Sequence, residues 1–279
     1  MRKPSIFSLV LFILVEFGFS QGVSLRFQPE PGQTFNYLLL SETTVIQSAM
    51  GMEQVVFSKT ESKFKYLIQN VSPNGNVEMI ISIDTIKTSI KTQMPPMDTT
   101  FSFPIAFKFK QVHDKYGKPL NYEIIEGGEV QIPMGGGTRR IDKRNYTFSL
   151  VFPQDKLTPG KSWSFSYSDT STAEEGKTIV KTNGEYTFEG IEEKLGLECA
   201  RLKLDANLSL SGSGTIQGMN YGLEGEGKNK GTVWVEVKSG VIVYSEMDTE
   251  MDIAMGISGQ VEMTMPMTQK VKSTLSLIK

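Results

Sequence analysis

The chain has 279 residues with 29 basic and 31 acidic side chains, a formal net charge of −2, and 39% hydrophobic residues. This composition excludes a disordered chain, and the near-neutral balance offers no electrostatic field that would hold nucleic acid. A single Cys excludes an internal disulfide and a cysteine-rich zinc site, and a single His leaves little for histidine-based catalysis.

The N-terminus predicts a secretory signal peptide of 20 residues. Arg2 and Lys3 form a charged start, an apolar run follows at 6–15, and the segment 18–20 supplies the small residues of a cleavage site before Gln21. The apolar run is about half as long as the roughly 20 residues of a membrane-spanning helix. We therefore expect an exported protein in the periplasm or on the surface of a bacterium, with no transmembrane segment after cleavage.

Period-two alternation of apolar and polar residues dominates the rest of the chain. Trp163, Phe165 and Tyr167, for example, alternate with serines. Twist accumulates along long antiparallel strands, so we expect a mainly β fold whose long curved antiparallel strands form a half-barrel around the apolar face. Strands are predicted at 34–50, 52–71, 76–92, 197–211, 241–255 and 259–278, and a short helical turn at 137–145.

The two halves of the chain echo each other. The segments 31–37 and 159–165 both place aromatic residues after a Pro-Gly turn, and Met-rich patches follow at 94–97 and 263–267. Two interpretations stay open, a structural duplication and one continuous domain. The predicted N-terminal and C-terminal β halves are residues 21–152 and 153–279.

Three segments, at 151–163, 186–202 and 231–240, resemble a family of exported bacterial proteins of unknown function. The first carries the FP…G..W motif of that family between Phe152 and Trp163. The family is in turn similar to the LolA-like periplasmic carriers of lipoproteins and lipids. That wider resemblance implies a half-barrel whose concave side holds acyl chains, while the unknown-function family itself implies no particular ligand.

The titratable and sulfur-bearing residues form no recognisable catalytic or metal-binding motif. His113 and Cys199 lie in different halves with nothing to orient them as base and nucleophile, so we predict no enzymatic activity and no cofactor or metal. Thioethers of the Met-rich strands leave a Cu(I) site as an alternative, although His and Cys are missing nearby. Carboxylates at every second residue are about 7 Å apart, too far to converge on calcium, and indicate a solvated face. These carboxylates are Glu246, Asp248, Glu250 and Asp252.

The functional prediction concerns the apolar face, because Met side chains provide an adaptable apolar lining. We predict an exported, non-enzymatic binding protein of the cell envelope whose concave face holds an acyl chain or another apolar ligand. Its partner would be a lipid, a lipopeptide or an envelope protein. The predicted binding residues are Trp163, Phe165, Tyr167, Leu202, Leu204, Leu208, Met251, Met255, Met263 and Met265.

Two other interpretations stay open. In the first, the ten residues fill a closed core of an envelope structural or protein-interaction module without a small-molecule ligand, and exposed strand edges recruit a partner strand. In the second, export together with amphipathic strands describes an outer-membrane barrel. The C-terminal Lys279, where an aromatic residue would be expected, disfavours the second interpretation.

Overall fold

The structure, a computed structural model, describes residues 22–49, 52–93, 96–131, 138–140, 146, 150–173, 176–216, 218–259 and 262–278. The regular elements of these ranges are strands. In chain order they are β1 (Thr34–Ala49), β2 (Met52–Val71), β3 (Val77–Gln93), β4 (Pro96–His113), β5 (Pro119–Glu126), β6 (Glu129–Gln131), β7 (Thr138–Arg140), β8 (Ser162–Ala173), β9 (Gly176–Lys194), β10 (Leu197–Ile216), β11 (Met219–Glu236), β12 (Ile242–Ser258) and β13 (Met263–Ile278).

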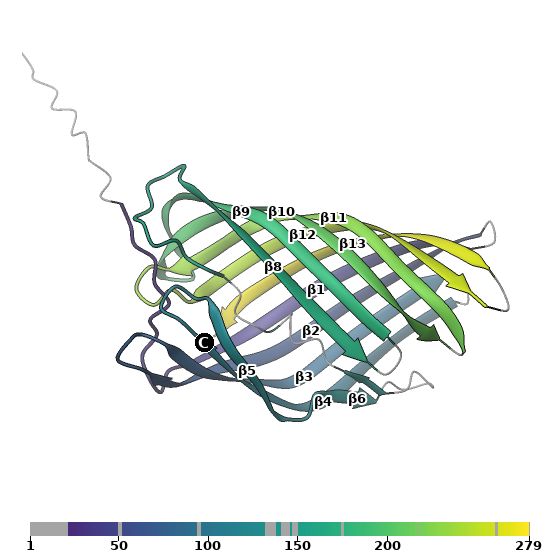
Figure 1. The fold of residues 1–279 in the computed structure, drawn as a ribbon. Coiled ribbons are helices and arrows are strands. Elements are labelled where there is room, and N and C mark those ends of the chain that lie inside the picture. Colours follow the sequence, from purple (N-terminus) through teal and green to yellow (C-terminus); the bar gives the residue numbers. More distant parts are fainter. Residues whose placement is uncertain are drawn as a thin grey trace, which may run out of the picture.

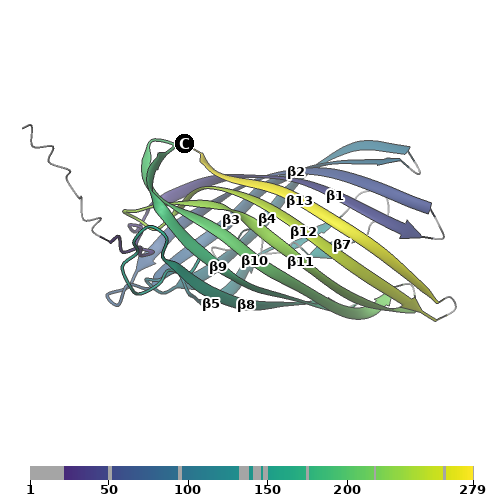
Figure 2. The same cartoon turned by 90° about the horizontal axis from the view of Figure 1, so that it is seen from above.

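Eleven of these strands form one antiparallel sheet in the order β5-β4-β3-β2-β1-β13-β12-β11-β10-β9-β8. Figures 1 and 2 show that this sheet curls into a trough. Within β1–β5 and within β8–β13, strands that follow each other in the sequence pair with each other, and the pairing of β1 with β13 joins these two groups. Among the described residues no ladder joins β5 to β8. The predicted fold of long curved antiparallel strands in a half-barrel is therefore confirmed.

The sheet has an apolar face and a polar face, and the apolar face is the concave one. Phe109 of β4 and Leu202 of β10 lie far apart in the strand order, yet both belong to one core cluster. Such a cluster requires that the sheet curl back over its apolar face. The opposite face carries cross-strand ion pairs, each worth at most about 1 kcal/mol because both partners are solvated. Examples are Lys59–Glu42 at 2.9 Å, Lys270–Glu250 at 2.8 Å and Lys108–Glu126 at 2.7 Å.

Core packing closes one end of the trough. Leu25 and Phe27, which precede β1, are buried there beside Phe152 and Leu157, which precede β8. Burying a large apolar side chain stabilises a fold by about 1.5–3 kcal/mol, so these two segments are part of the folded core. The other end of the sheet, where the β12–β13 hairpin turns, has partly exposed side chains on its inner face.

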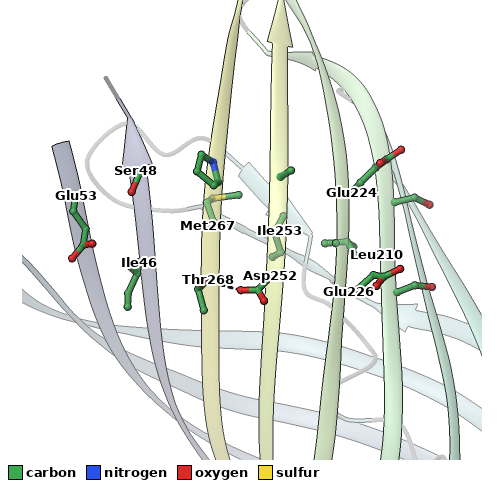
Figure 3. Close-up of a pocket in the computed structure, with 15 residues that line it drawn as sticks. Ile46, Ser48, Glu53, Leu210, Glu224, Glu226, Asp252, Ile253, Met267 and Thr268 are labelled. Carbon is green, nitrogen blue, oxygen red and sulfur yellow. Dashed lines mark hydrogen bonds between the residues drawn. The ribbon is translucent and has the colours of Figure 1, made fainter. Parts of the chain in front are cut away.

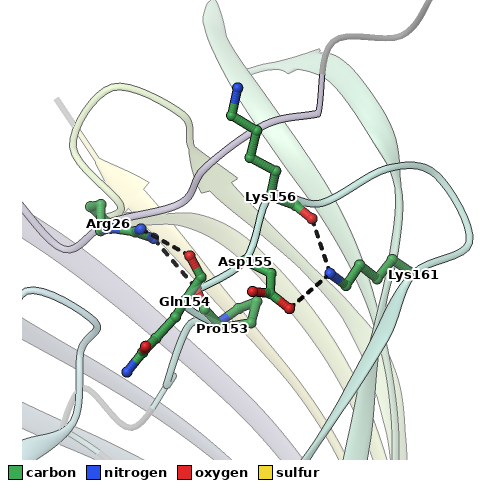
Figure 4. Close-up of polar contacts among 6 residues, drawn as sticks. All are labelled: Arg26, Pro153, Gln154, Asp155, Lys156 and Lys161. Carbon is green, nitrogen blue, oxygen red and sulfur yellow. Dashed lines mark hydrogen bonds and ion pairs between the residues drawn. The ribbon is translucent and has the colours of Figure 1, made fainter.

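Polar contacts hold the segment before β1 in place. Backbone hydrogen bonds of 2.8 and 2.7 Å link Val23 and Leu157 in both directions. The Arg26 guanidinium donates to the carbonyl oxygens of Pro153 and Gln154 at 3.4 and 3.1 Å (Figure 4). We call residues 22–28 the strap, because they tie the N-terminal end of the described chain to the segment that enters the second half.

The two Pro-Gly turns make equivalent hydrogen bonds. Gly32 N–H donates to the carbonyl oxygen of Ile68 at 2.8 Å, and Gly160 N–H donates to that of Phe188 at 2.7 Å. The φ angles of these glycines are +83° and +86°, a left-handed conformation that side-chain-bearing residues rarely adopt. Each turn opens a strand onto its antiparallel partner in the same way. The duplication of the two halves stays a prediction.

The predicted strands agree with the structure to within about five residues at their ends. The prediction of 76–92, for example, corresponds to β3 at Val77–Gln93. The predicted helical turn at 137–145 is wrong where the structure can test it, because Thr138–Arg140 forms β7 and pairs with β6. The rest of that segment, the signal peptide at 1–20 and part of the Met-rich patch at 94–97 lie outside the described residues.

Candidate functional site

The strand register places all ten predicted residues on the apolar face. One row across the sheet is formed by successive pairs from Tyr167 to Thr182, Leu208, Gly227 and Met251. A second pair joins Met255 directly to Met265 on the terminal hairpin. The ten residues thus share one face of the sheet.

The ten residues nevertheless occupy two different environments. Leu202 and Leu204 are buried, and Trp163 packs against the same core cluster at the closed end. They fill the core, as the alternative interpretation predicted for all ten. The other seven are only partly buried or exposed, and they line the open part of the trough: Phe165, Tyr167, Leu208, Met251, Met255, Met263 and Met265.

Four stacked aromatic rings follow the rim of the trough on β8 and β9. Tyr186 stands between Trp163 and Phe165, with ring centroids 5.6 and 4.9 Å apart and interplanar angles of 30° and 29°. Phe165 continues the stack to Tyr167 at 6.0 Å and 16°. The Trp163 indole N–H donates to the carbonyl oxygen of Val151 at 2.9 Å, which fixes the inner end of the stack. Tyr167, at the outer end, is 46% exposed.

In the part of the chain that the structure describes, no strand pairs with the outer edges of β5 and β8, and the trough is open along the seam between them. β8 spans 12 residues, contains neither Lys nor Pro, and has Asp169 as its one charged residue. Natural proteins usually protect an edge of this length with lysine, proline or a bulge. On the other edge, β5 exposes about half of each of three apolar side chains, Leu120, Ile124 and Ile125. The sequence analysis did not predict this edge. A signal for it exists, because the adjacent apolar residues 124 and 125 place apolar side chains on both faces of a short strand.

Hollows of the described surface lie mainly among polar side chains, and two of them are lined in part by predicted residues, Leu208 in one and Phe165 in the other. One hollow of about 860 Å³ crosses β1, β13, β12, β11 and β10 toward the end of the sheet where the β12–β13 hairpin turns (Figure 3). Four carboxylates line it, and one of them, Asp252, accepts a hydrogen bond from the Thr268 hydroxyl at 2.8 Å. The four are Glu53, Glu224, Glu226 and Asp252. Within the described ranges, no group of three or more His, Cys, Asp or Glu is placed to hold a metal ion.

The residues that were tested for catalysis do not meet. His113 belongs to β4, and its Nδ1 lies 2.8 Å from the carbonyl oxygen of Gly117, inside the closed end. Burial lowers the pKa of this imidazole to about 4. Cys199 is buried beneath Trp234 on the other face of the sheet, and burial raises the pKa of its thiol to about 11. A thiol with that pKa is a poor nucleophile at neutral pH.

Comparisons with known proteins give neither a matching family model nor a matching curated protein. Among solved structures, OccK2 (OpdF) of Pseudomonas aeruginosa aligns with 5% identity and a TM-score of 0.34, covering 89% of this chain and 99% of that one. An outer membrane channel from Pseudomonas putida F1 aligns with 7% identity and a TM-score of 0.30, covering 90% and 98%. OccK7 (OpdD) of P. aeruginosa aligns with 6% identity and a TM-score of 0.28, covering 89% and 100%. At these values the likeness is limited to a large curved antiparallel sheet.

The prediction of an envelope binding protein whose concave face holds an acyl chain or another apolar ligand is wrong. The comparisons bring up outer membrane channels where LolA-like carriers were expected. The geometry also departs from that prediction, because three of the ten residues fill core and the 860 Å³ hollow is lined by none of the ten. Nor do the described residues form a fully closed core, since those in the core cluster fill one end of the trough while side chains near the β12–β13 turn stay partly exposed. Among the described residues, no helix has the length and apolar character to cross a membrane.

Proposed function

We propose that this chain works in the bacterial cell envelope by binding an extended segment of a partner polypeptide along the free edge of β8. The added strand would lie in the seam between β8 and β5. The observation that carries this proposal is the 12-residue edge of β8, which lacks the lysine and proline that protect natural edges. Strand addition uses such an edge because its unpaired N–H and C=O groups bind the backbone of an incoming strand.

The side chains around the seam specify the incoming strand. On the inner face it would lie beside the stack of Trp163, Phe165 and Tyr167, where aromatic and β-branched neighbours contribute about 0.2–1 kcal/mol per pair. On the outer face β8 presents serines, which leave room for short polar side chains. Leu120 and Ile124 of β5 offer further apolar contacts across the seam. A partner segment with alternating apolar and short polar residues therefore fits.

The test uses a probe that the chain itself provides, because β9 is the strand that already pairs with β8. A fluorescently labelled peptide that copies residues 177–188 is titrated with the purified protein, and its polarisation is measured. Tyr167→Lys places a charge on the inner side of the edge, whereas Tyr167→Thr keeps a neutral strand-forming residue there. We expect saturable binding that falls at least about tenfold in Tyr167→Lys and changes less than about threefold in Tyr167→Thr.

Two results would overturn the proposal. One is the absence of saturable binding to the unmodified protein. The other is equal binding to the Tyr167→Lys variant, because the peptide would then be bound elsewhere. Circular dichroism of each variant shows whether the sheet is intact, and Tyr167, at 46% exposure, is a position where substitution leaves the core in place.

A further inference from the structure

The hairpin between β9 and β10 carries a leucine that its backbone disfavours. Lys194 pairs with Leu197, so Leu195 and Gly196 form a two-residue turn. Their φ angles are +53° and +79°, and a turn with both central residues at positive φ is a type I′ turn. Asn-Gly is the preferred sequence there, because a branched apolar side chain at positive φ meets its own backbone. Among the described residues, Leu195 is the one residue other than glycine with positive φ.

The fold buries only about half of this leucine. The Leu195 side chain is 48% exposed, and Ile191 on the same hairpin is 39% exposed. Glu193 and Glu198 are both exposed and pair directly across the two strands, where like charges repel. In the part of the chain that the structure describes, neither of these carboxylates forms an ion pair. A leucine at positive φ, exposed apolar side chains and a pair of like charges thus lie together at one hairpin tip, and such locally unfavourable features are typical of functional sites.

The tip is held rigidly from the polar side. The Lys194 ammonium lies 4.1 Å from the ring centroid of Trp234 and 4.0 Å from that of Tyr244. The Trp234 indole N–H donates to Glu192, and Glu192 also pairs with Arg201 at 3.7 Å. A cation between two aromatic rings contributes about 0.5–2 kcal/mol. Because the turn is braced in this way, little conformational entropy would be lost when a partner covers it.

We propose that this tip, formed by Ile191, Glu193, Leu195 and Glu198 and here called the Leu195 knob, docks into an apolar pocket of a partner protein whose rim is basic. The knob supplies an apolar anchor with two uncompensated carboxylates beside it, which is complementary to such a pocket. The site goes beyond the proposed strand addition. The ladder between β8 and β9 ends at Ser162 and Thr187, so the knob lies past the end of the β8 edge.

The first test separates binding from folding. In the purified protein, Leu195→Asn installs the preferred type I′ residue, so we expect the thermal midpoint to rise by about 2–4 °C. A fall in the midpoint would show that Leu195 serves the fold and would overturn the proposal. The same substitution is expected to abolish docking, so stability and binding move in opposite directions.

The second test identifies the occupant in the native host. A photoreactive amino acid replaces Leu195, and Met52, 61% exposed at the start of β2, is the control site. We expect a protein adduct at 195 that exceeds the adduct at 52, that maps to a basic, apolar segment of the partner, and that falls at least about tenfold when Glu193→Lys and Glu198→Lys are combined. Glu224→Lys with Glu226→Lys reverses the same charge elsewhere and should leave the adduct unchanged.

Four outcomes would overturn the proposal. They are an adduct at 195 no stronger than at 52, an adduct insensitive to the charge reversal at the knob, an adduct to lipid, and an adduct to a second copy of this chain. None of these results bears on the β8 edge, whose test is the peptide titration.

Discussion

Stability should fall on mild acidification because of His113. The imidazole is buried in the closed end, 2.8 Å from the carbonyl oxygen of Gly117 and edge-on to Phe27 at 5.7 Å. Burial lowers its pKa from 6.5 to about 4. The unfolded chain therefore binds a proton between these two values and the folded chain does not, so the contribution to stability is present above pH 6.5 and is lost as the pH falls toward 4.

The expected size of the effect follows from this shift. Between pH 7 and pH 5 the linkage relation gives a loss of about 2 kcal/mol. His113 is the one histidine of the chain, so no other imidazole titrates in this window. The window also ends above the usual pKa values of Asp and Glu.

The assay is urea unfolding of residues 21–279 at pH 7, 6 and 5, followed by near-UV circular dichroism. His113→Gln removes the titration while keeping a polar side chain of similar size. We expect this variant to be less stable at every pH, with a stability that changes by less than about 0.5 kcal/mol across the window. Wild-type stability that is flat from pH 7 to pH 5, or an equal slope in His113→Gln, would refute the reasoning.

Three further predictions concern packing. Leu202→Ala should lower the free energy of unfolding by about 2–5 kcal/mol in urea, because Leu202 is fully buried at the closed end. Leu208→Ala, in the open trough, should lower it clearly less, and equal losses would contradict the distinction between core and trough. Gly231→Ala should destabilise by more than about 1 kcal/mol, because a Cβ there would lie 2.1 Å from a backbone oxygen of β12, whereas Gly222→Ala, with no atom within 4 Å, should be neutral or stabilising. Arg26→Ala should speed amide exchange in the strap with a change in global stability below about 1 kcal/mol, because it removes three hydrogen bonds that are exposed or half-buried. Unchanged exchange would show that the strap is held by its backbone hydrogen bonds and apolar burial without help from Arg26.

Much of the fold could be predicted because its signals are local. Alternation assigned Leu202 and Leu204 to the apolar face, and it placed six strands close to their observed bounds. The pairing of β1 with β13 could not be predicted, because no local pattern specifies which strands are neighbours. For the same reason the sequence gives no sign that the strap fills one end of the trough.

The site was harder to predict, because exposure depends on the whole curved sheet. Trp163 and Met251 share an apolar face, but only the three-dimensional arrangement separates a residue packed against the core from one that lines an open trough. The free edge of β8 likewise follows from the order of all eleven strands. Leu195 had a local signal, a leucine where a type I′ turn prefers Asn, but that signal has meaning only once the two-residue turn is known.

The central claim, that β8 is a free edge that receives a partner strand, is tested most directly by hydrogen exchange measured residue by residue. In the free protein, the amides of β8 that point away from β9 should exchange at least about 100-fold faster than those of β10, because β10 lies between β9 and β11 whereas no described strand pairs with the outer edge of β8. Addition of the 177–188 peptide should slow these amides and leave the rest of the sheet unchanged. Amides of β8 that are as protected as those of β10 in the free monomer, or that are unaffected by bound peptide, would contradict the account.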